Sequence, residues 1–399
     1  MKKIAVNELV TGTAYDKPVY IDRENMLVDA YEALKDSDIE RLKKWNIKEV
    51  ETDGNLATPK IIEKEIIPEG PEKIDIDKAV AELRKAAQAR EKVQSLIANG
   101  SKIITEAYEV LAAEKPYQIS TVRNLAEDIV NLSMDSPLAF ISLYYQDYGA
   151  NTLYSHLVQA AIFGAYLGNA LELSVPKSIE LCFSILLMDV GMMQLSASIR
   201  MKEGKLNEFE KSQLQAHPLH GYQLLTQFAK VKNSVAMVAL QHQEHFDGSG
   251  YPRHTKGEDI TEYARIAIIV DSYSALLEDK AYRKKKLPYA AMKELLAFGL
   301  YRYDPNYMKH FLYKFSIYPV GSLVELSDKS FGMVVRSGHE KPMRPLVYIY
   351  RDSRGNSPEK MKFVHLLYQP EIYIMNPVLP ENANFDYNAE ADLLLKKIQ

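Results

Sequence analysis

Residues 242–252 read HQEHFDGSGYP, and this is the most specific stretch of the sequence. Gly248 and Gly250 flank a serine, and a Tyr-Pro pair follows directly. Glycine adopts backbone angles that other residues avoid, and proline is common in turns, so the pattern predicts a sharp change of direction. Because histidines precede it, the turn is expected to follow the end of a His-rich helix.

Further positions with metal-ligand chemistry lie on both sides of this stretch. His156, Asp189 and His217 precede it, and Asp271 follows in the run IIVDS. Successive positions lie roughly 25 to 35 residues apart, which is about one helix and one loop. Several helices are therefore expected to place one donor each in a common centre, where imidazole and carboxylate groups can bind a metal ion.

Together these motifs resemble those of the HD-GYP domain, a helical, metal-dependent phosphodiesterase fold that hydrolyses cyclic-di-GMP. The family signature is His-His-Glu followed by Asp-Gly-x-Gly-Tyr-Pro, and it corresponds here to residues 242–244 and 247–252. The resemblance extends from about residue 148 to about residue 311. It implies common ancestry with the family and leaves activity to be judged residue by residue.

The predicted fold is mainly α, with an all-helical HD-GYP-like domain between a small N-terminal α+β module and a small C-terminal β appendix. Short β-like runs before a helical stripe indicate the first module, and three β-rich runs at residues 322–326, 331–335 and 346–350 indicate the appendix. The expected boundaries are 1–57 for the N-terminal module, 58–74 for a connector, 75–146 for a helical linker and the start of the helical domain, 147–316 for the HD-GYP-like domain, and 317–399 for the β-rich appendix and tail.

A long helix is expected from residue 75, because apolar residues recur at helical spacing. Asn99-Gly100 is expected to end it, since this pair favours a helix C-terminus. Two interpretations of the helix stay open. Residues 75–98 can pair with a second copy in a homodimer, or the helix can pack along its own domain with a solvated charged face.

The resemblance implies a ligand set that is partly retained. The retained metal-ligand positions are His156, Asp189, His217, His242 and Asp271. Asp189 would also be the catalytic residue if the chain is active. Three further family positions are altered. The His of the His-Asp dyad is Met188, the Lys of the same motif is Met192, and the second His of the His-His pair is Gln243.

These changes weaken the case for a catalytic metal centre. A thioether is a soft ligand that suits copper(I), Gln243 offers only a neutral amide, and Met192 lacks the cation that the family places beside the phosphate. Asp189, His217 and His242 still form a two-His-one-carboxylate set for one ion. The expectation is that no metal is bound and that the retained residues hydrogen-bond one another in a buried polar core. The alternative is one or two iron or manganese ions.

The glycine-rich loop is intact, so binding can outlast catalysis. In the family, this region is linked to the nucleotide and to contacts with diguanylate cyclases. The residues assigned to nucleotide or partner contacts are Asp247, Gly248, Gly250, Tyr251, Pro252, Lys280 and Arg283. The alternative for the two basic residues is a solvated charged face.

Composition excludes several classes of protein. The chain has 49 basic and 53 acidic residues and a net charge of −4, so no excess of positive charge indicates DNA or RNA binding. Its single cysteine, Cys182, excludes an internal disulfide framework. No signal peptide is visible, and the uncharged window 148–171 contains too many polar residues for a membrane span. The protein is expected to be soluble and cytoplasmic.

Two functions of different classes remain open. The first is a catalytically silent HD-GYP relative in signalling, which binds cyclic-di-GMP, a partner protein, or both. The second is an active metal-dependent cyclic-di-GMP phosphodiesterase, a phosphoric diester hydrolase, with a reduced metal site. The three altered positions favour the first, and the retained donors keep the second open. A weaker third interpretation is a structural scaffold.

Overall fold

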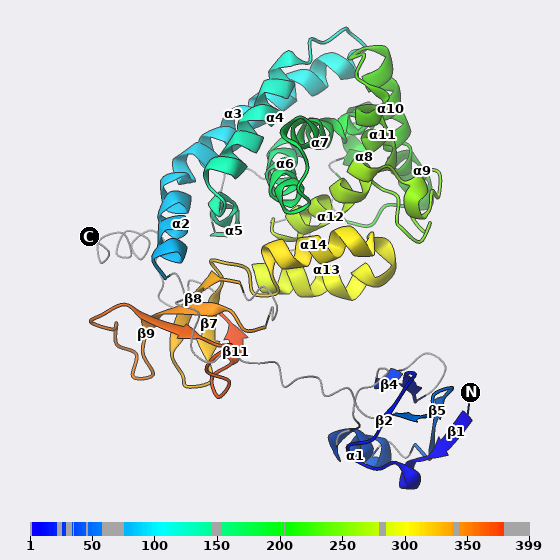
Figure 1. The fold of residues 1–399 in the computed structure, drawn as a ribbon. Helices are drawn as coiled ribbons and strands as arrows, with labels where there is room; N and C mark the ends of the chain where they lie inside the picture. The colour runs from blue at the N-terminus through cyan, green and yellow to red at the C-terminus, as the bar shows by residue number, and fades with distance from the viewer. Residues whose placement is uncertain are drawn as a thin grey trace. The chain divides into compact units, whose positions relative to one another are not determined.

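The structure is a computed structural model, and it describes residues 2–21, 26–28, 34, 36–44, 47–57, 76–145, 153–200, 202, 204–278, 285–337 and 343–378. The chain forms two units, Met1–Ile74 and Asp75–Gln399 (Figure 1). Each unit has a hydrophobic core of its own.

The N-terminal unit is a small α+β fold. Its elements are β1 (Lys2–Ala5), η1 (Val6–Glu8), β2 (Ala14–Tyr15), β3 (Val19–Tyr20), β4 (Met26–Val28), α1 (Asp36–Lys44), β5 (Glu49–Thr52) and β6 (Leu56–Ala57). The larger sheet is antiparallel with the order β1-β5-β3-β4, and β2 pairs with β6. Its core includes Val19 from the sheet and Leu42 from α1, so sheet and helix bury each other's apolar side chains.

The second unit is built mostly from helices. They are α2 (Ile76–Gln88), α3 (Arg90–Ala112), α4 (Ser120–Asp135), η2 (Ala139–Ile141), α5 (Ser142–Tyr145), α6 (Leu153–Ala170), α7 (Val175–Leu187), η3 (Val190–Gln194), α8 (Ala197–Arg200), α9 (Glu208–Gln215), α10 (His217–Gln227), α11 (Asn233–Gln241), η4 (Gly257–Asp259), α12 (Glu262–Leu276), α13 (Pro288–Arg302) and α14 (Pro305–Phe315).

Helix α6 runs through the middle of this unit (Figure 1). It contacts α3, α4, α7, α12 and α14, and residues on all its sides are buried. A helix that is apolar all round is typical of one enclosed by others. Two polar side chains are buried with it, His156 and Gln159, and buried polar groups require partners inside the protein.

The first long helix is predicted wrongly in two respects: it is divided into α2 and α3 at Ala89, and its predicted end is wrong. Helix α3 continues through Gly100 to Ala112. A Cβ on Gly100 would lie 2.9 Å from the Val158 side chain and 3.1 Å from the Leu125 side chain. This glycine therefore lets α3 pack closely against α6 and α4, and it does not stop the helix.

Within the described part of the segment 75–98, two apolar side chains have partners within the chain. Val93 and Ile97 are buried in the core of the helical unit. These residues contributed to the helical spacing on which the homodimer interpretation rests. The structure thus uses them for packing along their own domain.

The C-terminal strands form one antiparallel sheet. They are β7 (Leu323–Leu326), β8 (Phe331–Arg336), β9 (Leu346–Arg351), β10 (Lys362–His365) and β11 (Ile374–Pro377). Their order is β10-β9-β8-β7-β11. The first three coincide with the predicted β-rich runs, whereas β10 and β11 were not predicted. Val334, Val347 and Ile349 lie in the core that the sheet buries.

The predicted fold class is confirmed. A helical core is flanked by a small N-terminal α+β unit and by C-terminal strands. Among the helices that the structure describes, none has the length and apolar character that crossing a bilayer requires.

Candidate metal centre

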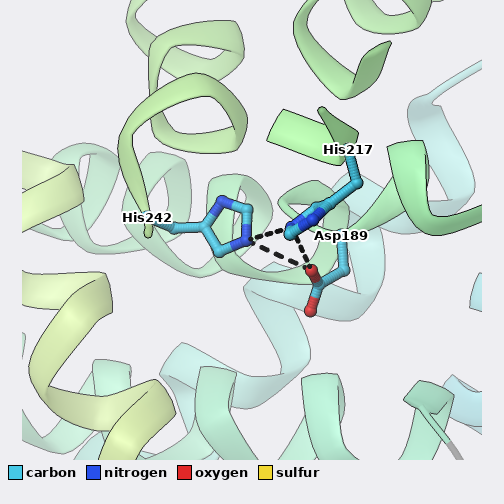
Figure 2. A group of neighbouring side chains, drawn as sticks. All are labelled: Asp189, His217 and His242. Carbon is cyan, nitrogen blue, oxygen red and sulfur yellow. Dashed lines mark hydrogen bonds and ion pairs between the residues drawn. The ribbon is translucent and has the colours of Figure 1, made fainter. Parts of the chain in front are cut away.

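Three of the predicted ligands lie together at the ends of helices. Asp189 lies between α7 and η3, His217 is the first residue of α10, and His242 directly follows α11. The three side chains point toward one another (Figure 2). Segments that are far apart in the sequence therefore supply one donor each to a common centre.

The donor atoms of this group are within contact distance of one another. The Asp189 Oδ1 atom lies 3.1 Å from His242 Nε2 and 3.3 Å from His217 Nε2. The two Nε2 atoms are 3.1 Å apart. All three residues are buried. The group is thus shielded from water, and its donors face each other instead of separate partners.

The protein backbone fixes the orientation of both imidazole rings. His217 Nδ1 donates to the carbonyl oxygen of Leu214 at 2.7 Å, and His242 Nδ1 donates to that of Ala239 at 2.9 Å. Both carbonyls lie in the last turn of a helix, where backbone oxygens have no intrahelical partner. Since each Nδ1 carries a proton, each Nε2 is left as the atom that can bind an ion.

This arrangement fits a single divalent metal ion. Two imidazoles and one carboxylate, with donor atoms all within 4.8 Å of one another, form a set that iron(II) and similar ions accept. Metal-binding histidines ordinarily donate their second N–H to a carbonyl or a carboxylate, as both do here. The Asp189, His217 and His242 side chains, hereafter the metal group, can therefore hold one ion.

A proton and a metal ion compete for the metal group. Burial alone would raise the pKa of Asp189, but hydrogen bonds from His217 and His242 hold it well below its usual range. Burial also opposes protonation of His242, yet the hydrogen bond to Asp189 raises its pKa above the usual value. A proton on His242 Nε2 thus satisfies the carboxylate, and metal binding requires its release.

Close backbone packing positions Asp189 against His217. Gly191 in η3 lies so near the start of α10 that a Cβ would overlap the carbonyl oxygen of His217 and approach the backbone of Gly221. Only a residue without a side chain permits this approach. Gly191 therefore determines the separation of two members of the metal group.

The other two predicted ligands belong to a second cluster. His156 Nε2 lies 2.8 Å from Asp271 Oδ1, and His156 Nδ1 lies 3.2 Å from Glu278 Oε1. Gln159 Nε2 also donates to Glu278 Oε1 at 3.1 Å. His156 thus bridges two carboxylates, and both of its ring nitrogens are engaged. The Asp271 charge still contributes to the raised pKa of His242, so the two clusters are neighbours.

Glu278 was not recognised in the sequence. Its side chain is 3% exposed and pairs with the buried His156. The signal was its spacing, because Asp271, Ser274 and Glu278 recur at the three- and four-residue intervals of one helical face. A buried carboxylate that ends such a series needs a buried donor, and His156 supplies it.

The second cluster makes stability depend on pH. Burial opposes protonation of His156, but the charges of Glu278 and Asp271 outweigh it and raise its pKa to about 10. Because the pKa of His156 is higher in the folded than in the unfolded state, its protonation stabilises the folded protein. This stabilisation is fully present below the unfolded-state pKa of 6.5 and is lost as the pH rises toward 10. Between these values, the free energy of unfolding should fall by about 1.4 kcal/mol per pH unit relative to His156→Gln.

Urea denaturation of both proteins at several pH values in this window, followed by far-UV circular dichroism, measures that difference. Glutamine keeps hydrogen-bonding capacity and lacks the titrating proton, so the variant isolates the charge. Parallel curves for the two proteins would contradict a protonated His156.

The three positions that the resemblance marks as altered lie as follows. Met188 is fully buried next to Asp189 and carries a neutral thioether. Met192 and Gln243 are half-buried. The Gln243 backbone carbonyl accepts from the Tyr251 N–H at 3.0 Å, so its main chain supports the glycine-rich loop.

The glycine-rich loop has a defined fold. Glu244 is fully buried, and its carboxylate accepts from the backbone N–H groups of Arg253 and Thr255 at 2.8 and 3.1 Å. Gly248 has φ of +85°, which glycine adopts without strain. The Tyr251 ring meets the His217 ring edge-on, with centroids 6.2 Å apart. The loop therefore borders the metal group.

Other predicted site residues are placed as follows. Asp247 is exposed and accepts from the Ser249 N–H at 2.9 Å, within the same turn. Gly250 packs so closely on Glu244 that a Cβ would overlap its backbone. Lys280 and Arg283 lie outside the described residues.

Comparisons with known proteins agree with this architecture. A family model described as HD domain matches residues 149–307, and one described as KOW domain associated with HD domain matches residues 323–385. The chain is similar to the cyclic di-GMP phosphodiesterase PA4108 of Pseudomonas aeruginosa, with 25% identity over 92% of this chain and 89% of that protein. It is 30% identical to the cyclic di-GMP phosphodiesterase PdeB of Borreliella burgdorferi, over 51% of this chain and 54% of that protein.

A solved structure covers most of the chain. It is Bd1817 of Bdellovibrio bacteriovorus, described as an HDG"Y"P protein, with a TM-score of 0.47 and 16% identity over 78% of this chain and 97% of that one. The alignment with the Borreliella protein spans about half of that relative's length. The matched family model and the relatives lead to one conclusion. The chain contains an HD domain at residues 149–307, and its relatives include proteins named as cyclic di-GMP phosphodiesterases.

Proposed function

We propose that the chain binds cyclic-di-GMP through its HD domain and does not hydrolyse it. The observation that carries this proposal is the division of the retained ligand positions into two clusters. Asp189, His217 and His242 converge on one point, whereas Asp271 and Glu278 contact different ring nitrogens of His156, so these three do not form such a group among the described residues. Hydrolysis of a phosphodiester in a two-metal site needs ions on both the attacking and the leaving oxygen.

Each part of the site has a role in this proposal. The metal group would hold one divalent ion at most, and that ion would supply a Lewis acid for a phosphate oxygen. His217 and His242 keep their Nε2 atoms directed inward because backbone carbonyls hold Nδ1. The loop of residues 247–252 places Tyr251 at the edge of the metal group, where the nucleotide would lie.

The second candidate is an active cyclic-di-GMP phosphodiesterase with a reduced metal site. Two observations favour it. The metal group has the donor types and the outer hydrogen bonds of a metal site, and both relatives described above are named as cyclic-di-GMP phosphodiesterases. In this case Asp189 would be the catalytic residue.

Hydrolysis is the measurement that separates the two candidates. The wild-type chain, supplied with manganese or iron(II), is expected to release no linear dinucleotide or GMP from cyclic-di-GMP, as measured by chromatography. Met188 and Gln243 each stand where the family has an imidazole ligand, and Met192 stands where it has a lysine cation. Loss of one such stabiliser commonly costs about 100- to 1,000-fold in rate. The triple variant Met188→His, Met192→Lys and Gln243→His is expected to gain turnover.

His217→Ala, made in both backgrounds, is the matched control. If the wild type hydrolyses the dinucleotide and His217→Ala abolishes this, the phosphodiesterase is the correct function. Calorimetric titration of the wild type with cyclic-di-GMP should show binding. Absence of binding would contradict the proposed function and would favour a scaffold or a protein-binding module instead.

A further inference from the structure

Arg302 is held against the glycine-rich loop by its main chain. It is the last residue of α13, and its carbonyl oxygen accepts from the Phe246 N–H at 2.9 Å. Phe246 belongs to the stretch of residues 242–252 that borders the metal group. Because this bond uses backbone atoms, the position of Arg302 does not depend on its own side chain.

The Arg302 side chain carries a charge that the protein leaves unneutralised. It is half-buried, its Nε atom is buried without an acceptor, and it forms no ion pair with the residues that the structure describes. Its Cζ lies 5.7 Å from the centroid of the Tyr303 ring. Such a cation–π contact offsets part of the free-energy cost of burying a cation. The Tyr303 ring does not, however, accept a strong hydrogen bond from the guanidinium. The two terminal nitrogens form no hydrogen bond with the residues that the structure describes, so they are the donors available for an anion.

Two tyrosines connect Arg302 to the candidate site. The Tyr251 ring contacts His217, and the Tyr303 hydroxyl hydrogen-bonds Ser272, the neighbour of Asp271. Burial raises the pKa of Tyr251, the charges of Asp189 and Asp271 raise it further, and the Arg302 charge acts in the opposite direction. The pKa of Tyr251 is thus influenced both by the carboxylates of the site and by the guanidinium.

We propose that Arg302 binds a phosphate of the cyclic dinucleotide held at the metal group, in place of the cation that Met192 lacks. This inference rests on the proposed function. The guanidinium is planar, is always charged, and binds phosphate oxygens with two parallel hydrogen bonds. A phosphodiester beside Tyr251 compensates the unpaired charge and accepts from the terminal nitrogens of the guanidinium.

Substitution of Arg302 tests the assignment directly. Calorimetric titration with cyclic-di-GMP is expected to show at least about tenfold weaker binding for Arg302→Gln, because a hydrogen-bonded charge pair is lost. The affinity of this variant should also depend less on salt concentration, since one ionic contact is missing. Arg302→Lys keeps the charge without the planar fork, so its affinity should be intermediate. The same substitution at the exposed Arg123 of α4, Arg123→Gln, should leave binding unchanged.

The outcomes distinguish this inference from the function on which it rests. Equal affinity and equal salt dependence in wild type, Arg302→Gln and Arg302→Lys would overturn the role of Arg302 while cyclic-di-GMP binding stands. Absence of binding in the wild type would overturn both. Thermal unfolding of each variant checks that it folds. If Arg302→Gln does not fold, the comparison of wild type with Arg302→Lys decides alone.

Discussion

Gly191→Ala is expected to prevent folding of the helical unit or to lower its free energy of unfolding by more than about 4 kcal/mol. The added Cβ would overlap the carbonyl oxygen of His217 and approach the backbone of Gly221. These are main-chain atoms at the start of α10, so no rotation of a side chain relieves the overlap. Any backbone shift that does so moves Asp189 away from His217. Urea denaturation followed by far-UV circular dichroism measures the loss.

Gly168→Ala is the matched control, since Gly168 also lies in the helical unit. A Cβ there would lie 3.3 Å from Ser178 Oγ and 3.6 Å from Leu173 Cδ1, which are side-chain atoms that can adjust. Alanine also favours the helical conformation of α6. We expect a change within about 1 kcal/mol. A similar small change for Gly191→Ala would show that η3 and α10 are farther apart than the structure has them.

Asp189→Asn is expected to weaken manganese binding at least about 100-fold. The wild type should take up about one ion per chain, because the metal group supplies a single two-His-one-carboxylate set. Asp189 is its only negative charge, and an amide of the same shape cannot replace that charge. Calorimetric titration with manganese gives the affinity, and elemental analysis after gel filtration gives the stoichiometry.

Asp271→Asn provides the contrast. The nearest partner of Asp271 is His156, so its substitution should change the affinity for this ion by no more than about threefold. An equal loss in both variants would mean that the two clusters hold the metal jointly. Two tightly bound ions in the wild type would contradict the proposed single-ion site and favour the phosphodiesterase.

Local signals in the sequence were sufficient for much of the fold. The glycine-rich stretch of residues 242–252 indicated a turn after a helix, and most of the uncharged window 148–171 forms the enclosed helix α6. Period and composition predicted β7, β8 and β9. These features depend on residues near one another in the chain, so the sequence alone contains the information.

Features that depend on contacts between distant segments were missed or wrong. Gly100 was expected to end a helix, yet α3 continues because Leu125 and Val158 pack where a side chain would be. Glu278 and Arg302 looked like ordinary charged residues. Their significance comes from His156 and from the loop at Phe246, which only the tertiary fold brings to them.

The sequence by itself determined the mainly helical fold class, and the resemblance predicts five retained donors on separate segments and three altered family positions. Only the tertiary structure decided how those donors divide. Asp189, His217 and His242 converge because α7, α10 and α11 end or begin around one point, with Gly191 permitting the close approach. His156 instead lies between Asp271 and Glu278. The spacing of residues along the chain indicates which helix carries a donor. The packing of the helices against one another determines the direction in which that donor points.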